Sequence, residues 1–238
     1  MLASKKIKCR QLLRQIRRLF SFSGIRHKIN QCINSELNQA DSVSIMKKIL
    51  ITGANGFLGQ HLSIFLANAG YQVISTGKGE KRLAADNICY ESVELTNSAE
   101  VQLLLRKHSP NVIIHNAALS KPDECENNRE YCLQVNVEST RYLLASANPR
   151  FIYISTDFIF GENGPHAENA RPGPLNFYGQ SKLIAEQLVK QTRKTAAIVK
   201  PAFIYGRAWD GMRPTFLYWV KNNLEQKKQI KVDRKSVV

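Results

Sequence analysis

The stretch TGANGFLG, residues 52–59, decides the fold of this chain. An apolar strand pattern at 48–52 precedes it and a helical pattern at 58–68 follows, so its glycines stand at a strand-to-helix turn. In a GxxGxxG turn, the first glycine permits the tight turn, the second lets the backbone approach a pyrophosphate, and the third lets the helix pack on the sheet. The helix N-terminus adds free N–H groups and partial positive charge. The motif predicts a dinucleotide site that includes Gly53, Asn55, Gly56, Phe57, Leu58 and Gly59.

From Met46 onward, strand and helix patterns alternate. We expect strands at 48–52, 72–76, 88–93, 111–115, 150–154 and 196–200, and helices at 58–68, 98–107, 130–147 and 177–190. Such repeated units with apolar strands indicate an α/β fold, a Rossmann-type doubly wound parallel sheet. A helix at 215–223 and a strand at 230–232 then begin a C-terminal lobe that we expect to be truncated. We therefore predict an NAD(P)-binding Rossmann domain at 46–206 and the start of an incomplete substrate-binding lobe at 207–238.

The first 45 residues differ from the rest. They hold nine Lys and Arg residues against two acidic residues, and residues 12–20 carry an apolar helical stripe. Three interpretations stay open: a helix on an anionic membrane surface, an Arg-rich transit peptide, or translation that starts at Met46. We expect the third, in which this basic extension is not part of the mature protein, because Met46 stands directly before the first strand.

Composition excludes several classes. With 238 residues, of which 43% are hydrophobic, the chain builds one large domain or one domain plus a small lobe. No apolar run reaches the roughly 18 residues of a membrane span. Five scattered cysteines without a CxxC pair disfavour a disulfide framework or a structural zinc site, so we expect a cytoplasmic protein without a metal. The net charge of +15 suits an anionic ligand such as a nucleotide, but the basic N-terminus lacks the interleaved aromatic residues of a nucleic-acid binder.

The end of the second strand predicts the type of cofactor. An acidic residue there favours NAD and a basic one favours NADP, because this position meets the adenosine ribose. Thr76 ends the expected strand, and Lys78, Lys81 and Arg82 follow closely. This favours NADP, while Glu80 leaves NAD open.

Tyr178 and Lys182 form a YxxxK pair, and positions i and i+4 share one face of a helix. A nearby ammonium favours the phenolate and is expected to lower the pKa of the tyrosine. Thr156 follows the expected strand 150–154, and ligands of open α/β sheets bind beyond the carboxyl ends of the strands. The Thr156 hydroxyl should therefore stand near the phenol and bind a substrate carbonyl. We predict Thr156, Tyr178 and Lys182 as the catalytic residues.

Four stretches carry a family resemblance: TGANGFLG (52–59), HNAA (115–118), ISTDFIFGENGP (154–165) and PLNFYGQSKLIAE (174–186). Together they resemble extended short-chain dehydrogenases, and most of all the dTDP-4-dehydrorhamnose reductase group, over residues 47–232. The resemblance implies NAD(P)H-dependent reduction of the 4-keto group of a nucleotide-linked deoxysugar, in deoxysugar or polysaccharide synthesis. It implies Tyr178 as the proton donor, Thr156 as the group that orients the oxygen, and Lys182 as the third member of the triad.

The same resemblance implies further roles. It assigns cofactor contacts to Glu94, Leu95, Ala117, Ala118 and Pro201, and a structural role to Asn136. His115, Cys125 and Cys132 gain no role from it, and we expect them to be core or loop residues. The family continues beyond residue 238 into the lobe that completes the sugar-nucleotide site. A nucleotide-sugar substrate is expected, and a homodimer is allowed.

Alternative functions remain at this stage. An epimerase of the same superfamily would show no net consumption of cofactor. A dehydratase is disfavoured, because such enzymes carry carboxylates after the strand-end threonine, and here Asp157 is followed by Phe158. A cofactor-binding regulatory subunit that resembles the one of methionine adenosyltransferase is also open, although the intact triad weighs against it.

Overall fold

The computed structural model describes residues 47–206, apart from 84, 86, 146–148 and 163, together with residues 215–229 and with 28, 29, 31 and 33. Its sheet has six parallel strands in the order β3-β2-β1-β4-β5-β6. These are β1 (Lys48–Thr52), β2 (Gln72–Gly77), β3 (Cys89–Ser92), β4 (Val112–His115), β5 (Arg150–Ile154) and β6 (Ala197–Val199). This is the strand order of a Rossmann fold, and it confirms the predicted doubly wound parallel sheet.

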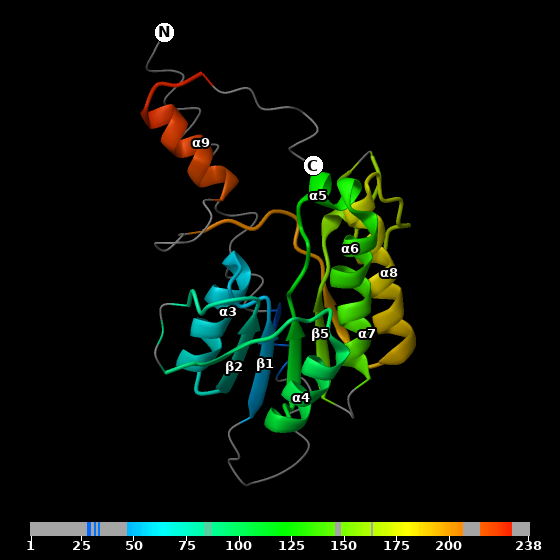
Figure 1. Cartoon of the computed structure of the whole chain (residues 1–238). Coiled ribbons are helices and arrows are strands. Elements are labelled where there is room, and N and C mark those ends of the chain that lie inside the picture. The colour runs from blue at the N-terminus through cyan, green and yellow to red at the C-terminus, as the bar shows by residue number, and fades with distance from the viewer. Residues whose placement is uncertain are drawn as a thin grey trace.

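Helices cover both faces of the sheet (Figure 1). The α-helices of the described residues that pack around it are α3 (Phe57–Asn68), α4 (Ser98–His108), α5 (Pro122–Asn127), α6 (Arg129–Leu133), α7 (Ser139–Leu144) and α8 (Phe177–Thr192). Helix α9 (Phe216–Glu225) lies apart from the sheet (Figure 1). Successive strand residues point to opposite faces, so β1 supplies both layers of the core. Ile49 and Ile51 pack with residues of α3 on one face. Leu50 packs with residues of α4, α7 and α8 on the other.

The expected helix 130–147 is wrong as a single regular helix. The chain instead passes through α6, a π-helical turn (Gln134–Glu138) and α7 in succession. Within this turn the Asn136 side chain donates to the carbonyl oxygen of Leu119 at 3.2 Å and accepts from its backbone N–H at 2.8 Å. This anchoring to a separate loop accompanies the bulge, and π turns within helices are frequent at functional sites.

The other predicted elements are present within two residues of their expected ends, and the predicted strand 196–200 and strand 88–93 are each shorter in the structure. The short helix α5 was not predicted, although Pro122 at its first position is a typical start signal. The apolar stripe at 12–20, residue 147 at the end of the expected long helix, and the expected strand 230–232 lie outside the described residues.

The described residues of the N-terminal segment contact the core. Ile29 and Ile33 are fully buried in the same cluster as Leu62 and Leu66 of α3. The structure thus gives this segment two core side chains. Exclusion of residues 1–45 from the mature protein stays a prediction.

The glycine turn depends on missing Cβ atoms. Gly53 has a φ of 67°, and a Cβ atom there would lie 2.8 Å from the backbone nitrogen of Ala117. At Gly59, a Cβ atom would lie 2.2 Å from the carbonyl oxygen of Gly53. The first glycine thus permits the turn against the end of β4, and the third permits α3 to pack on it, as the sequence predicts.

Gly59→Ala is expected to lower the free energy of unfolding by about 1–3 kcal/mol, because the added methyl group overpacks a rigid backbone contact. Chemical denaturation measures this. Gly173→Ala is the matched control, since a Cβ atom there meets its nearest neighbour at an ordinary 3.6 Å. Equal midpoints for the two variants would contradict the packing role of Gly59.

Candidate functional site

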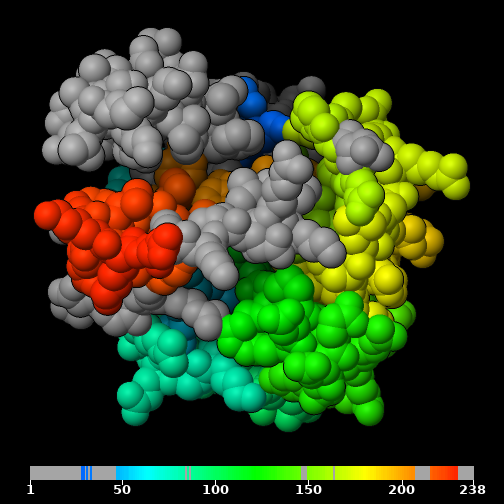
Figure 2. Space-filling model, turned by 90° about the horizontal axis from the view of Figure 1, so that it is seen from above, coloured from blue at the N-terminus to red at the C-terminus, as the bar shows by residue number. Residues whose placement is uncertain are grey.

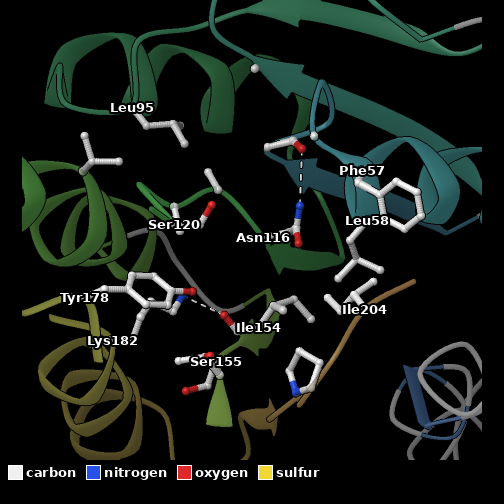
Figure 3. A pocket seen from close by; sticks show the side chains of 18 of the residues that line it. Phe57, Leu58, Leu95, Asn116, Ser120, Ile154, Ser155, Tyr178, Lys182 and Ile204 are labelled. Carbon is white, nitrogen blue, oxygen red and sulfur yellow. Dashed lines mark hydrogen bonds between the residues drawn. The ribbon is translucent and has the colours of Figure 1, made fainter. Parts of the chain in front are cut away.

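A cavity of about 530 Å³ lies at the carboxyl ends of the strands. This is the size of a small-molecule site. Figure 2 views this end of the molecule, where segments far apart in the sequence share one face: teal and green segments lie at the bottom, yellow ones at the right and red helix α9 at the left. Figure 3 shows Phe57 and Leu58 on one side of the cavity and Tyr178 and Lys182 on the opposite side. The glycine turn and the predicted triad therefore face one common space.

The glycine turn forms one wall. Gly53, Gly56, Phe57 and Leu58 line the cavity. Gly56 is the N-cap of α3, whose first turn has neither an acidic residue nor a side-chain cap among the described residues. The N-terminus of α3 therefore keeps backbone N–H groups and partial positive charge for an anion.

Asn55 supports the turn from outside the cavity. Its amide nitrogen donates to the carbonyl oxygens of Lys78 (3.1 Å) and Glu80 (2.9 Å) and to the hydroxyl of Tyr90 (2.8 Å). Its amide oxygen accepts from the backbone N–H of Arg82 at 3.0 Å. Because these four bonds occupy the amide, the structure assigns Asn55 to the connection between β2 and β3, while its contact with a cofactor stays a prediction.

The part of the cavity that the sequence assigns to the adenosine half of the cofactor, after β2, differs from the prediction at Thr76. Thr76 is fully buried and donates its hydroxyl to the carbonyl oxygen of Glu91 at 2.8 Å, so it does not line the cavity. Lys78 does line it, and its ammonium lies 2.8 Å from the Glu94 carboxylate. This hydrogen bond lowers the pKa of Glu94 and raises that of Lys78. Leu95 also lines the cavity, as predicted.

The other two basic residues after β2, Lys81 and Arg82, do not line the cavity. The Lys81 ammonium donates to the carbonyl oxygens of Ala85 at 2.6 Å and Ile88 at 3.2 Å. The Arg82 backbone is held by Asn55. Of the three cations considered for cofactor choice, Lys78 is the one that lines the cavity.

The end of β4 is fixed by a buried histidine. The Thr52 hydroxyl accepts from the backbone N–H groups of Asn116 and Ala117, each at 3.1 Å, and bonds His115 Nδ1 at 2.7 Å. His115 Nε2 lies 3.0 Å from the Thr140 hydroxyl, which itself donates to a backbone carbonyl. Burial lowers the pKa of His115 to about 3, so the ring is neutral, with Nδ1 accepting and Nε2 donating. The predicted core histidine is thus a positioning group for the cavity wall at Ala117 and Ala118.

The predicted triad is brought together. Tyr178 and Lys182 lie on α8, Thr156 follows β5, and all three line the cavity. The approach of α8 to the Thr156 turn depends on Gly179, where a Cβ atom would lie 2.2 Å from the carbonyl oxygen of Phe158. Thr156 donates its hydroxyl to Asp157 at 3.1 Å, and the hydroxyl oxygen accepts from the backbone N–H of Phe158 at 3.3 Å.

Lys182 is fully buried and does not point at the phenol. Its ammonium donates to the carbonyl oxygen of Ile154 at 2.7 Å (Figure 3). It also lies 4.2 Å from the centre of the Tyr153 ring. Burial lowers the pKa of Lys182 to about 7, and the nearby Glu186 carboxylate opposes this shift.

The expected lowering of the tyrosine pKa is wrong in this structure. Burial raises the pKa of Tyr178 to about 12, and the nearby Thr156 hydroxyl offsets part of that shift. Burial also raises the pKa of Asp157 to about 6. At neutral pH the phenol therefore keeps its proton and is able to donate it.

Pattern reasoning missed Glu186, which ties the strand ends to α8. Its carboxylate is 1% exposed and accepts from the Ser155 hydroxyl (2.9 Å) and from Lys190 (2.7 Å), with Lys200 at 3.4 Å. Burial works to raise the pKa of Glu186, but Lys190, Ser155 and Lys200 together lower it. The i, i+4 spacing from Lys182 was the signal available in the sequence.

The helix behind the triad is held by polar contacts of Asn136. Its amide nitrogen donates to the Ser181 hydroxyl at 2.8 Å, and Ser181 donates to the carbonyl oxygen of Tyr178 at 2.7 Å. Cys125 and Cys132 are free, buried and packed against Tyr178, in agreement with the expected core role. Pro201 lines the cavity as predicted, and Asn116, Ser120 and Tyr131 are lining residues that pattern reasoning missed.

This sheet order, glycine turn and buried Tyr/Lys pair define a Rossmann-type nucleotide-binding domain of the extended short-chain dehydrogenase/reductase class. The chain belongs to the RmlD substrate binding domain family, which matches residues 46–237. Among the described residues, no helix is long and apolar enough to cross a membrane.

Similar curated proteins include two kinds. Methionine adenosyltransferase 2 subunit beta of Xenopus laevis is 33% identical over 175 residues, which cover 72% of this chain and 51% of that protein. Spore coat polysaccharide biosynthesis protein SpsK of Bacillus subtilis (strain 168) is 28% identical over 182 residues, covering 72% and 58%. This chain thus spans about half the length of the curated relatives it matches.

Solved structures agree with the fold. A dTDP-4-dehydrorhamnose reductase from Bacillus anthracis str. Ames, in complex with NADP, superposes with a TM-score of 0.65 at 28% identity, covering 78% of this chain and 62% of that one. UDP-glucose 4-epimerase of Thermotoga maritima shares the fold, with a TM-score of 0.67 at 20% identity. The match covers 78% of this chain and 65% of that one. The family match and the likeness to the reductase confirm the resemblance to the dTDP-4-dehydrorhamnose reductase group that the motifs indicate.

Glu186→Gln is expected to lower the free energy of unfolding by about 1–3 kcal/mol at pH 7, because two ammonium groups lose their buried anion. The folded-state pKa of Glu186 is lowered, so its contribution is present above the unfolded value of about 4.3 and is lost as the pH falls through the folded value. Urea denaturation at pH 7 and at pH 3 should show the difference between variant and wild type shrinking in acid. Glu225→Gln, which removes an exposed carboxylate, is the control. A difference independent of pH would argue against the charge.

Proposed function

We propose that this chain binds a nicotinamide dinucleotide in the cavity and carries the reduction site of an NAD(P)H-dependent reductase acting on a 4-keto nucleotide sugar. The observation that supports this most is the placement of Thr156, Tyr178 and Lys182 around the same cavity as the glycine turn. The similarity to dTDP-4-dehydrorhamnose reductases supports the substrate class.

The cavity fits such a cofactor. The uncapped N-terminus of α3, reached past the missing Cβ atom of Gly56, suits the pyrophosphate. Gly77, Lys78, Glu94 and Leu95 would hold the adenosine half, and Ala117, Ala118 and Pro201 would line the path to the nicotinamide. The bound cofactor supplies the hydride for the reduction.

The residues of the chain supply the remaining chemistry. Tyr178, protonated at neutral pH, would donate its phenolic proton to the oxygen that develops negative charge. Thr156, which lines the cavity together with Tyr178, would orient that oxygen. Lys182 would hold the ribose of the nicotinamide half. Burial of all three side chains excludes water, which strengthens these polar contacts.

The division of labour along the chain is part of this proposal. Residues 46–206 would bind the cofactor, and residues 207–238 would begin the lobe that closes on the sugar nucleotide. Helix α9 is the described part of that second region.

A second candidate is a regulatory subunit that uses the cofactor only as a ligand. The 33% identity to methionine adenosyltransferase 2 subunit beta supports it. Stoichiometric recovery of a methionine adenosyltransferase catalytic subunit with the tagged chain, without turnover of any 4-keto nucleotide sugar, would favour this function over the reductase.

Tyr178→Phe should lower the turnover of a dTDP-4-keto-6-deoxy sugar by about 10²- to 10⁴-fold, because the proton donor is lost, while the dissociation constant of NADPH changes little. Stopped-time product analysis and a fluorescence titration of NADPH measure the two quantities. Tyr218→Phe, at an exposed tyrosine of α9, is the control. Unchanged turnover in Tyr178→Phe would rule out the reductase mechanism.

NADPH should bind more tightly than NADH, because the Lys78 ammonium at the adenosine end favours a 2′-phosphate. Lys78→Ala should reduce that preference about tenfold or more, the size of one hydrogen bond to a charged group. Parallel fluorescence titrations of both cofactors test this. Lys81→Ala should leave the ratio unchanged, since its ammonium is held by backbone carbonyls. Tighter binding of NADH to the wild type would overturn the NADP preference.

A further inference from the structure

Three side chains with metal-binding atoms meet away from the cavity, at the edge of the sheet. Cys89 and Glu91 are alternate residues of β3, so their side chains leave the same face of the strand. His108 is the last residue of α4. The thiol sulfur, a carboxylate oxygen and an imidazole nitrogen all lie within 4.8 Å of one another. Glu91 Oε1 and His108 Nε2 are already 2.5 Å apart.

We infer that Cys89, Glu91 and His108 form a binding site for a divalent transition-metal ion, with Zn²⁺ as the expected occupant. Thiolate, imidazole and carboxylate are the donors that zinc prefers in proteins, whereas calcium and magnesium take oxygen ligands. Three protein ligands leave a fourth tetrahedral position for water.

The geometry needs only a small adjustment. Zinc–ligand bonds of about 2.0–2.3 Å in a tetrahedron separate the ligand atoms by roughly 3.3–3.8 Å. The ligand atoms of Cys89, Glu91 and His108 now lie up to 4.8 Å apart, so they would approach one another by about 1 Å on binding zinc. Cys89 is exposed and lies on an edge strand that pairs with β2, so its side chain is free to turn toward the other two.

The site is open to solvent at Cys89 and covered by protein around Glu91 and His108. The exposed thiol of Cys89 gives an ion a path from solvent. The side chains of Glu91 and His108 are 22% and 15% exposed, so protein covers most of both. Partial removal from water strengthens the attraction between a carboxylate and a cation.

Lys107 already supplies a positive charge at this position. Its ammonium lies 2.7 Å from Glu91 Oε1, while the lysine side chain is 59% exposed. A divalent ion would displace the Lys107 ammonium from the Glu91 carboxylate, and the exposed lysine side chain would then extend into solvent. Lys107 therefore competes with the metal, and its removal should tighten metal binding, an effect that non-specific surface binding would not show.

A metal ion at this site would also hold in place the segment that lines the adenosine end of the cavity. It joins β3 to the end of α4, and the segment between these elements carries Val93, Glu94 and Leu95 into the adenosine end. A metal ion bound to both elements would hold that segment. Since an ion that binds only the folded state stabilises it, the thermal midpoint should rise with Zn²⁺ in the absence of any nucleotide.

The test uses the full chain with Co²⁺ and Zn²⁺ alone. One equivalent of Co²⁺ should give a thiolate-to-cobalt charge-transfer band that one equivalent of Zn²⁺ abolishes, and isothermal titration should give the Zn²⁺ affinity. Cys89→Ser should lose the band. His108→Gln should weaken Zn²⁺ binding by more than about tenfold, since even changes around a metal's ligands cost 10- to 100-fold. Lys107→Gln should tighten it.

Two controls separate this site from others. Cys9→Ser combined with Cys32→Ser removes the thiols that lie outside the described residues, and His166→Gln removes an exposed histidine that bonds the Gly161 carbonyl. Both should leave Zn²⁺ binding unchanged. A band retained in Cys89→Ser, or weaker binding in Lys107→Gln, would overturn the proposal. Because no step involves cofactor or substrate, the result is independent of the reductase proposal.

Discussion

The close backbone contact around Gly53 and Gly59 is the constraint on which the rest of this structure depends. At both positions a Cβ atom would lie within 2.8 Å of backbone atoms, so only glycine lets β1, α3 and the end of β4 approach this far. That approach brings the N-terminus of α3 to the strand ends. It thereby leaves a cavity whose one wall is made of backbone N–H groups, and an anionic ligand is the natural occupant of such a wall.

A buried polar network carries this constraint across the sheet. Thr52 at the glycine turn bonds His115, and His115 bonds Thr140. Thr140 donates to the carbonyl oxygen of Asn136 in the preceding π-helical turn, and the Asn136 side chain bonds Ser181 on α8. Every member is paired, and the histidine is neutral because its burial disfavours the charged form. A network that is fully paired in a low dielectric fixes distances well, since breaking one bond leaves a buried polar group unsatisfied. The glycine turn and the helix of the triad are thus held in one frame.

Desolvation dominates the electrostatics of the triad. A lysine four residues from a tyrosine suggests a phenolate, yet burial raises the pKa of Tyr178 to about 12 and lowers that of Lys182 to about 7. The ammonium is turned to the carbonyl oxygen of Ile154 instead of the phenol. Glu186 is the anion that opposes the neutralisation of Lys182. The helical spacing placed the two groups on one face, and the depth of the cavity decided their protonation.

The sequence by itself determined the doubly wound parallel sheet and the glycine turn, because both follow from local periodicity and spacing. It also determined the convergence of Thr156, Tyr178 and Lys182, because the carboxyl ends of parallel strands lie at one edge of the sheet. It did not determine the hydrogen bonds of Asn55 to the connection between β2 and β3, the burial of Thr76 away from the cavity, or the π turn at Asn136. Nor did it reveal the meeting of Cys89 with His108. Each of these depends on contacts between residues far apart in the chain, whose side chains choose partners only after the sheet and helices have packed. Hydrogen bonding and burial are properties of that packing, and no short-range pattern encodes them.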